Sequence, residues 1–232
     1  MNNVMVITGT RKGIGRYLAE YYLGKGLIVC GCSREDSDLT HKNYEHFCLD
    51  VADERAVRKM ISSITKQYKK IDYLINNAGI ASMNHSFLTP LSVVEKLCKT
   101  NIFGTFLFCR EAGKIMAKNK VGRIINFTTV ASPLNLEGEA IYASTKAAVE
   151  KLTTILSKEF GQNGITVNAI GPSPIKTDLI KNVGEDKLAL LIEKQAIKGF
   201  GSFEDVSNVC DFFIKDESKM ISGQIIYLGG VF

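Results

Sequence analysis

Short apolar runs alternate with amphipathic segments along the whole chain. The continuous apolar runs predict strands that are buried on both faces of a sheet. They are Val4–Ile7, Ile28–Cys32, His46–Leu49, Tyr73–Ile75, Arg123–Phe127, Ile165–Ile170 and Ile225–Leu228. Between them, apolar residues recur at helical spacing in Gly13–Leu23, Glu54–Tyr68, Val93–Met116, Tyr142–Phe160, Lys187–Gln195 and Phe203–Phe213. This alternation predicts a doubly wound parallel sheet of the α/β class, with right-handed crossovers and helices on both faces.

Composition adds limits to this picture. We see no linker, repeat or low-complexity segment, so we expect a single domain over residues 1–232. No apolar stretch approaches the 18 or so residues of a membrane span, and the start has no charged leader, so we expect a cytoplasmic protein without membrane contact. Cys30, Cys32 and Cys109 lie in apolar runs and no Cys-x-x-Cys occurs, which indicates reduced core thiols. The net charge of +5 is dispersed, which argues against nucleic acid.

A glycine-rich turn follows the first predicted strand. The segment Gly9-Thr10-Arg11-Lys12-Gly13-Ile14-Gly15 leads directly into a helical pattern. Strand, glycine turn and helix are the context of a dinucleotide site. Gly9 permits the tight turn, Gly13 lets the backbone approach a pyrophosphate, and Gly15 allows close packing of helix on strand. The alternative is an ordinary strand-to-helix turn.

A second motif carries candidate chemistry. Tyr142 and Lys146 are four residues apart and fall one turn apart on the same helix face. An adjacent ammonium favours the phenolate, so we expect the Tyr142 pKa to be drawn down from its usual value of roughly 10. Tyr142 would then serve as a general acid or base. Alone, this pair is more typical of a protein surface, and its weight comes from the glycine turn.

Several motifs in order resemble one family. The turn reads Gly-x-x-x-Gly-x-Gly and is followed by Asn76-Asn77-Ala78-Gly79, a lone Asn101, the Tyr142 and Lys146 pair, and a closing Gly229-Gly230. The sequence thereby resembles the short-chain dehydrogenases/reductases over essentially all its length. Its overall pattern is most similar to the 3-oxoacyl-(acyl-carrier-protein) reductases. The resemblance implies a Rossmann-like fold and hydride transfer with a nicotinamide cofactor.

The end of the second predicted strand bears on the choice of cofactor. Ser33 stands where NAD-dependent members of the family usually carry Asp, and Arg34 follows it. With Lys12 in the glycine turn, two cations suit the 2′-phosphate, so we expect NADP(H) rather than NAD(H). Glu35 and Asp36 come next and weaken the argument if they face inward, and either cation could simply be solvated.

The resemblance assigns a set of cofactor-binding positions. In the family, the counterpart of Asp50 contacts adenine, residues 77–79 approach the adenosine ribose, and Ile175 and Thr177 contact the carboxamide. The full set is Gly9, Arg11, Lys12, Gly13, Ile14, Gly15, Ser33, Arg34, Asp50, Val51, Asn77, Ala78, Gly79, Tyr142, Lys146, Pro172, Ile175 and Thr177. Where the family has Pro-Gly, this chain has Pro172-Ser173. Serine adopts positive φ less readily than glycine, so this loop is expected to differ in detail.

The resemblance also implies the catalytic residues Asn101, Thr129, Tyr142 and Lys146. The family's serine is replaced by Thr129, which keeps the hydroxyl but adds a methyl group that restricts χ1. Thr128 or Ser132 could serve instead, and a crippled site is the remaining alternative. In the family, the counterpart of Asn101 kinks its helix and holds a water in a proton relay to the lysine.

The expected function is an NADP(H)-dependent oxidoreductase that transfers hydride between nicotinamide and a carbonyl or alcohol. The substrate would be a 3-oxoacyl thioester or related ketone, including carrier-bound forms. Residues 173–199 are expected to form a substrate lid. Asn163 stands where carrier-dependent members often have a basic residue, and Lys120 compensates in part. The alternatives are a dinucleotide-sensing or scaffold protein without turnover and, third, a sugar-modifying member of the family.

The predicted helices around Asn101 and Tyr142 carry more apolar positions than one sheet face can cover. Examples are Phe103, Phe106 and Ile155. In the family these helices pair across a two-fold axis, and the C-terminal segment 221–232 forms a second contact. We therefore expect a homotetramer, or at least a homodimer.

Overall fold

The computed structural model describes residues 2–180 and 183–231. Its strands form one parallel sheet in the order β3-β2-β1-β4-β5-β6-β7. Their bounds are β1 Val4–Thr8, β2 Ile28–Ser33, β3 Tyr44–Cys48, β4 Tyr73–Asn76, β5 Gly122–Phe127, β6 Ile165–Gly171 and β7 Ile225–Tyr227. The predicted doubly wound α/β fold is confirmed.

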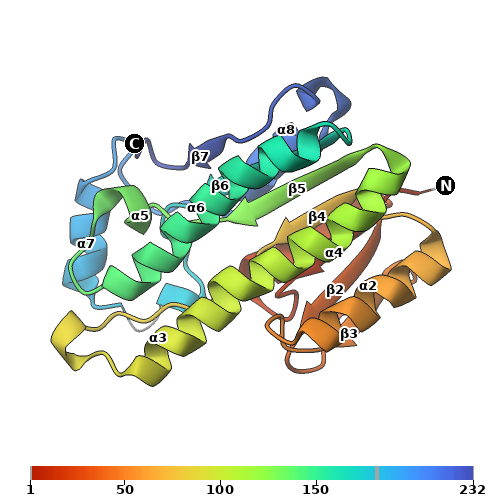
Figure 1. Ribbon diagram of the computed structural model, residues 1–232. Coiled ribbons are helices and arrows are strands. Elements are labelled where there is room, and N and C mark those ends of the chain that lie inside the picture. The colour runs from red at the N-terminus through yellow and green to blue at the C-terminus, as the bar shows by residue number, and fades with distance from the viewer. Residues whose placement is uncertain (1, 181–182, 232) are drawn as a thin grey trace.

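Helices cover both faces of this sheet. Their bounds are α1 Gly13–Gly24, α2 Glu54–Tyr68, α3 Leu91–Leu97, α4 Gly104–Asn119, α5 Ala131–Leu134, α6 Ala140–Gly161, α7 Glu185–Glu193 and α8 Phe203–Ile214, with short helices η1 Ser86–Leu88, η2 Cys98–Phe103, η3 Asp178–Ile180 and η4 Asp216–Ser218. Figure 1 shows α2, α4 and α6 side by side across one face, with α8 behind the sheet. It also shows α3, α5 and α7 gathered at the end toward which β5 points.

Strand β1 shows how the apolar runs build two cores. Val4 and Val6 belong to the cluster beneath α2, α4 and α6, whereas Met5 and Ile7 belong to the cluster beneath α1 and α8. Alternate residues of a strand point to opposite faces, so a strand covered on both sides must be apolar throughout. All five residues from Val4 to Thr8 are buried, as this requires.

The strand order indicates which edge of the sheet would hold a ligand. β1 lies between β2 and β4, so the chain leaves β1 toward one side of the sheet and later returns to its other side. Ligands of open α/β sheets bind outside the carboxyl ends of the strands at such a switch point. The glycine turn follows β1 and the Asn77–Gly79 segment follows β4, so both meet at this edge.

The structure differs from the predicted elements at several element ends, contains the unpredicted short helix α5, and divides one predicted helix. The helix expected over Val93–Met116 is divided into α3, a π-helical turn over Cys98–Phe103, and α4. The third strand begins at Tyr44 rather than His46, because Tyr44 and Glu45 pair with β2. Among the helices of residues 2–180 and 183–231, none has the length and apolar character that a membrane crossing requires.

Candidate active site

A cavity of about 420 Å3 opens at this edge of the sheet. Thirteen predicted cofactor residues line it: Gly9, Arg11, Lys12, Gly13, Ile14, Ser33, Arg34, Asp50, Val51, Asn77, Ala78, Gly79 and Thr177. The sequence argument missed Cys32, Glu35, Leu49, Ile80, Ala81, Thr100 and Asp178, which also line it. Most of these directly adjoin a predicted position, and that adjacency could have indicated them. Thr100 carried no such signal from the cofactor motifs.

The glycine turn has the shape that a dinucleotide needs. Gly9 and Gly13 have φ angles of 77° and 62°, the left-handed region that favours glycine. A Cβ at Gly15 would lie 2.2 Å from the Gly9 carbonyl oxygen, so only glycine fits at this position. Gly15 packs within the turn and does not line the cavity. Lys12, the N-cap of α1, makes no capping bond with its side chain, and the first turn holds no acidic residue. This helix start therefore fits a phosphate anion.

Asn77 ties the end of β4 to the glycine turn. Its Nδ2 donates to the Thr8 carbonyl oxygen at 2.9 Å and to that of Gly9 at 3.3 Å. The Ala78 amide donates to the Thr8 hydroxyl at 2.9 Å. These bonds hold two walls of the cavity at a fixed separation. The Asn77 side chain therefore shapes the cavity from behind.

The charges around the cavity are arranged differently from the expectation. Lys12 Nζ lies 2.8 Å from Asp178 Oδ2, so its charge is directed to the segment after β6 and not to the corner with Arg34. Arg11 takes part in that corner instead, with Nη1 2.9 Å from Glu35 Oε2. The corner therefore combines Arg11 and Arg34 with the Glu35 carboxylate.

Asn101 sits in the π-helical turn and is fully buried. Its Oδ1 accepts from the Ile80 amide at 2.9 Å, and its Nδ2 donates to the Ile80 carbonyl and to the Thr145 hydroxyl, both at 3.0 Å. The side chain thus ties the loop after β4 to α6. Such π-helical turns occur frequently at functional sites. The water-holding role that the resemblance implies stays a prediction.

Tyr142 and Lys146 lie on α6 and are both buried. Lys146 Nζ donates to the Phe127 carbonyl oxygen at the end of β5, at 2.8 Å. A Cβ at Gly79 would lie 3.2 Å from Lys146 Nζ and 3.4 Å from Asn101 Oδ1. The predicted catalytic ammonium therefore borders the Asn77–Gly79 wall of the cavity.

The expected lowering of the Tyr142 pKa is wrong for this structure. Burial raises the pKa of Tyr142 to about 12, and Glu139 adds to the rise while contact with the Thr129 hydroxyl opposes it. Burial also lowers the pKa of Lys146 to about 8, and the Glu150 carboxylate partly offsets that change. Removal from water disfavours the charged form of each group, and this outweighs the spacing that the sequence shows. The phenol is therefore protonated at neutral pH.

The three candidate hydroxyls have different partners. Thr129 accepts from the Ala131 amide at 3.3 Å, and its hydroxyl lies near enough to the Tyr142 phenol to oppose the rise in the pKa of Tyr142. Thr128 donates to the Glu150 carboxylate instead. Ser132 is in contact with Tyr227, whose pKa is raised by burial and by Glu150. Thr129 is thus the hydroxyl of these three that faces the phenol.

The segment after β6 follows the expectation only in part. Ser173 has no positive φ, since the non-glycine residues with positive φ in the described chain are Lys69, Lys120 and Asn135. Ser173, which stands where the family has glycine, therefore introduces no backbone strain. Ile175 packs into the core, and neither it nor Pro172 lines the cavity. Lys181 and Asn182 of the predicted lid lie outside the described residues, while Leu191 of α7 packs against Val130, next to Thr129.

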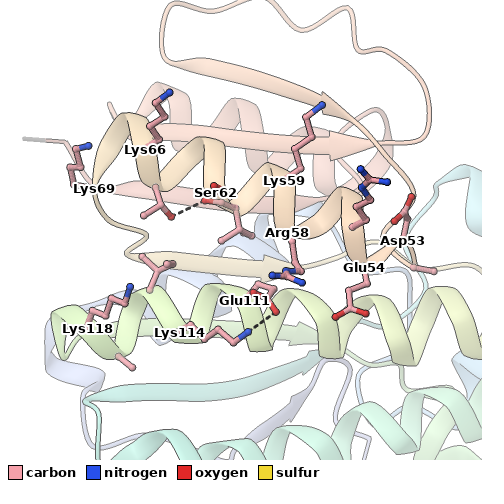
Figure 2. A pocket seen from close by; sticks show the side chains of 16 residues that line it. Asp53, Glu54, Arg58, Lys59, Ser62, Lys66, Lys69, Glu111, Lys114 and Lys118 are labelled. Atoms are coloured by element: carbon pink, nitrogen blue, oxygen red, sulfur yellow. Dashed lines mark hydrogen bonds and ion pairs between the residues drawn. The ribbon is translucent and has the colours of Figure 1, made fainter.

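A second, larger cavity lies between α2 and α4 and includes none of the predicted site residues. It is an open groove of about 1570 Å3 whose cations are Arg55, Arg58, Lys59, Lys66, Lys69, Lys114 and Lys118. The positive charge is therefore more concentrated than the sequence indicated. Figure 2 shows Lys59 and Lys66 pointing away from α4, while Lys114 reaches Glu111 at 2.9 Å. We interpret the groove as a solvated surface that is partly neutralised by its own acids.

Comparisons with known proteins agree with this geometry. A family described as enoyl-(acyl carrier protein) reductase matches residues 9–230. The 3-oxoacyl-(acyl-carrier-protein) reductase FabG of Staphylococcus epidermidis is 30% identical over 99% of this chain and 98% of its own. The solved structure "ElxO with NADP Bound" has a TM-score of 0.90 at 30% identity, over 98% of this chain and 97% of that one. "4-hydroxyisoleucine dehydrogenase complexed with NADH" has a TM-score of 0.88 at 25% identity, over 99% and 98%.

Proposed function

The chain belongs to the short-chain dehydrogenase/reductase family, and on this premise we propose that it is an NADP(H)-dependent reductase of carbonyl substrates. Tyr142 is the proposed general acid. One observation carries the proposal: the Thr129 hydroxyl lies near the Tyr142 phenol, and Lys146, one helical turn away, borders the cavity at Gly79. When a hydride adds to a carbonyl carbon, a proton donor, a second hydrogen-bond donor and a nearby cation stabilise the negative charge that develops on the oxygen.

The cavity fits a nicotinamide dinucleotide. Its glycine turn leaves space that a Cβ would fill, and its helix start, which has no acidic residue in the first turn, would hold the phosphates. The residues proposed to hold the cofactor are the thirteen predicted ones that line the cavity, with Lys146 at its border. The bound cofactor supplies the hydride. The chain supplies the orientation and the proton.

Proton transfer is the task of Tyr142. Its phenol is protonated at neutral pH, which is the form that a general acid requires for reduction. As the carbonyl oxygen gains negative charge, the Tyr142 phenol donates its proton and the Thr129 hydroxyl donates a second hydrogen bond. The Lys146 ammonium then stabilises the phenolate that remains. Because this charge stabilisation operates among buried groups, it is stronger than it would be in water.

Preference for the phosphorylated cofactor is proposed from Ser33 and Arg34, while Arg11 offsets the Glu35 carboxylate in the same corner. A hydroxyl and two guanidinium groups border the corner where an Asp would repel the 2′-phosphate. The neighbour with bound NADP supports the proposal at 30% identity, and the neighbour with NADH at 25% stands against it. Glu35 lies in the same corner, but Arg11 neutralises its carboxylate.

The proposed substrate is a 3-oxoacyl thioester or a related ketone with an apolar chain. The similar FabG proteins support the thioester class. The segment 173–199, which we propose as a lid, exposes Leu190 and Ile197. An apolar substrate chain would cover such side chains and gain from their removal from water. We also propose an assembly of two or four copies through α4, α6 and the end of η2, where Phe106, Ile155 and Phe103 are exposed.

A substrate panel tests the proposal. Purified protein is assayed with NADPH against 3-oxoacyl thioesters of increasing chain length and against simple ketones. Turnover of one class, with activity that rises with chain length, supports the proposal. Tight NADPH binding without turnover of any substrate would favour the dinucleotide-sensing alternative.

A further inference from the structure

A chain of hydrogen bonds lies behind the adenosine end of the cavity. The Thr10 hydroxyl and the Tyr44 phenol are 2.8 Å apart, and Tyr44 and His46 Nδ1 are also 2.8 Å apart. His46 Nε2 lies 3.0 Å from the Ser33 hydroxyl and 3.1 Å from the Glu35 carbonyl oxygen. This series of hydrogen bonds therefore runs from the glycine turn, through strand β3, to the corner that holds Ser33 and Arg34.

The chemistry of the end groups fixes the direction of these bonds. The Glu35 carbonyl oxygen can only accept, so His46 Nε2 carries the hydrogen. In the neutral imidazole Nδ1 then accepts, which makes Tyr44 its donor and Thr10 the donor to Tyr44. The Ser33 hydroxyl also donates to the Glu35 carbonyl, at 2.5 Å. Two donors thus share one carbonyl oxygen.

Gly31 leaves the space that this series of hydrogen bonds occupies. A Cβ there would lie 2.4 Å from both the Thr10 hydroxyl and the Tyr44 phenol oxygen. Gly31 pairs with His46 in the sheet and has a negative φ, so glycine is needed here for space and not for backbone conformation. Tyr44 and His46 are two residues apart on β3 and point to the same face of the sheet.

We propose that Tyr44 and His46 are positioning residues for cofactor specificity, which hold the Ser33–Glu35 bend ready for the adenosine 2′-phosphate of NADP(H). The inference rests on the proposed function, since it assumes that this cavity binds the cofactor. His46 bonds the Glu35 carbonyl independently of Ser33. The Ser33 hydroxyl can therefore turn its hydrogen to a phosphate oxygen without leaving that carbonyl unpaired. NAD(H) has no 2′-phosphate, so its binding does not require this hydrogen bond from Ser33.

The test compares the affinities of NADPH and NADH by fluorescence titration at one ionic strength. His46→Phe keeps a ring but removes both nitrogens, so NADPH should bind about fivefold to tenfold more weakly, the effect of one neutral hydrogen bond. NADH affinity should stay within about twofold, because it depends on no such bond. His46→Gln, whose amide can still donate to Glu35, should restore most of the NADPH affinity. Tyr44→Phe should change the ratio in the same direction, and it carries the test if His46→Phe does not fold.

Two further variants separate specificity from general damage. His41→Phe removes an imidazole from the loop before β3, where its Nδ1 accepts only from the Asn43 amide among the bonds of the described residues. It should leave both affinities unchanged. Because His46 acts through Ser33, the double variant Ser33→Ala/His46→Phe should bind NADPH no more weakly than Ser33→Ala alone.

Three results would overturn the inference in distinguishable ways. If the parent prefers NADPH but His46→Phe and Tyr44→Phe keep that ratio, the positioning role is wrong and the proposed function stands. If the two losses in the double variant add, His46 does not act through Ser33. If the parent itself shows no preference for NADPH, the proposed cofactor and this inference fail together.

Discussion

The Thr129 hydroxyl, which follows β5, lies near the Tyr142 phenol of α6 and opposes the rise in the pKa of Tyr142. Thr128 and Ser132 flank it in sequence, but they contact Glu150 and Tyr227. Thr129 can therefore meet a carbonyl oxygen together with Tyr142. Its methyl group restricts the side chain but does not remove the donor.

Thr129→Val should lower kcat by about 10²–10³, since it keeps the shape and deletes a donor to the developing oxyanion. Thr129→Ser should keep or raise kcat because the hydroxyl remains and turns more freely. The measurement is steady-state reduction with NADPH. Ser132→Ala is the matched control and should retain most of the activity. An active Thr129→Val beside an inactive Ser132→Ala would move the role to Ser132.

The rate of reduction should fall as pH rises through the Lys146 pKa of about 8, because the ammonium loses its proton. The Glu150 carboxylate raises that pKa. Glu150→Gln should therefore shift the alkaline fall of kcat/KM to lower pH. Glu95→Gln, at an exposed position of α3, is the control and should leave the profile in place. A Glu150→Gln profile that shifts to higher pH would contradict this electrostatic assignment.

Arg34→Ala should weaken NADPH binding and spare NADH. A charge-assisted bond to phosphate contributes about 1.5–3 kcal/mol, which corresponds to roughly 10- to 150-fold in affinity. Lys12→Ala should cost less, because Lys12 is already paired with Asp178. Fluorescence titration of both cofactors gives the answer. Equal loss of NADPH and NADH affinity in Arg34→Ala would show that Arg34 does not read the phosphate.

Phe106→Glu should convert the proposed assembly into monomers. In a contact of α4 and α6 across a two-fold axis, each introduced charge meets its own copy in an apolar interface. Sedimentation at micromolar concentration distinguishes the species. Ile197→Glu changes an exposed apolar residue outside these helices and should leave the assembly unchanged. A parent protein that sediments only as a monomer would refute the assembly.

Much of the fold could be predicted from local signals. Helix α2 has the predicted bounds because Asp53 caps its start by accepting from the Ala56 amide, and Lys69 ends it in the left-handed conformation. The family resemblance implied a kink at Asn101, but apolar periodicity gave no sign of the π-helical turn, because the turn depends on bonds from Asn101 to Ile80, which lies far away in sequence. Apolar periodicity continues through it almost unchanged.

The pKa values of the site residues also could not be predicted from the sequence. Spacing places Lys146 near Tyr142, but only tertiary packing shows that both are buried and that Lys146 bonds the Phe127 carbonyl. The edge strand β3 was predicted to begin at His46 and not at Tyr44, because the polar Glu45 interrupts the apolar pattern. His46, the first residue of the predicted strand, has bonding partners on β2 and in the bend that follows it, and nothing in the sequence indicated these partners.

The central claim is that Tyr142 donates the proton in an NADPH-dependent carbonyl reduction. Its most direct test measures turnover and NADPH affinity together for the parent, Tyr142→Phe and Lys146→Ala, on the best substrate of the panel. Tyr142→Phe should lose turnover while it keeps nearly the parent's affinity, because only the ionisable oxygen is removed. Lys146→Ala should lose both, since its ammonium borders the cavity and stabilises the phenolate. A Tyr142→Phe variant that retains most of the parent's turnover would contradict the account.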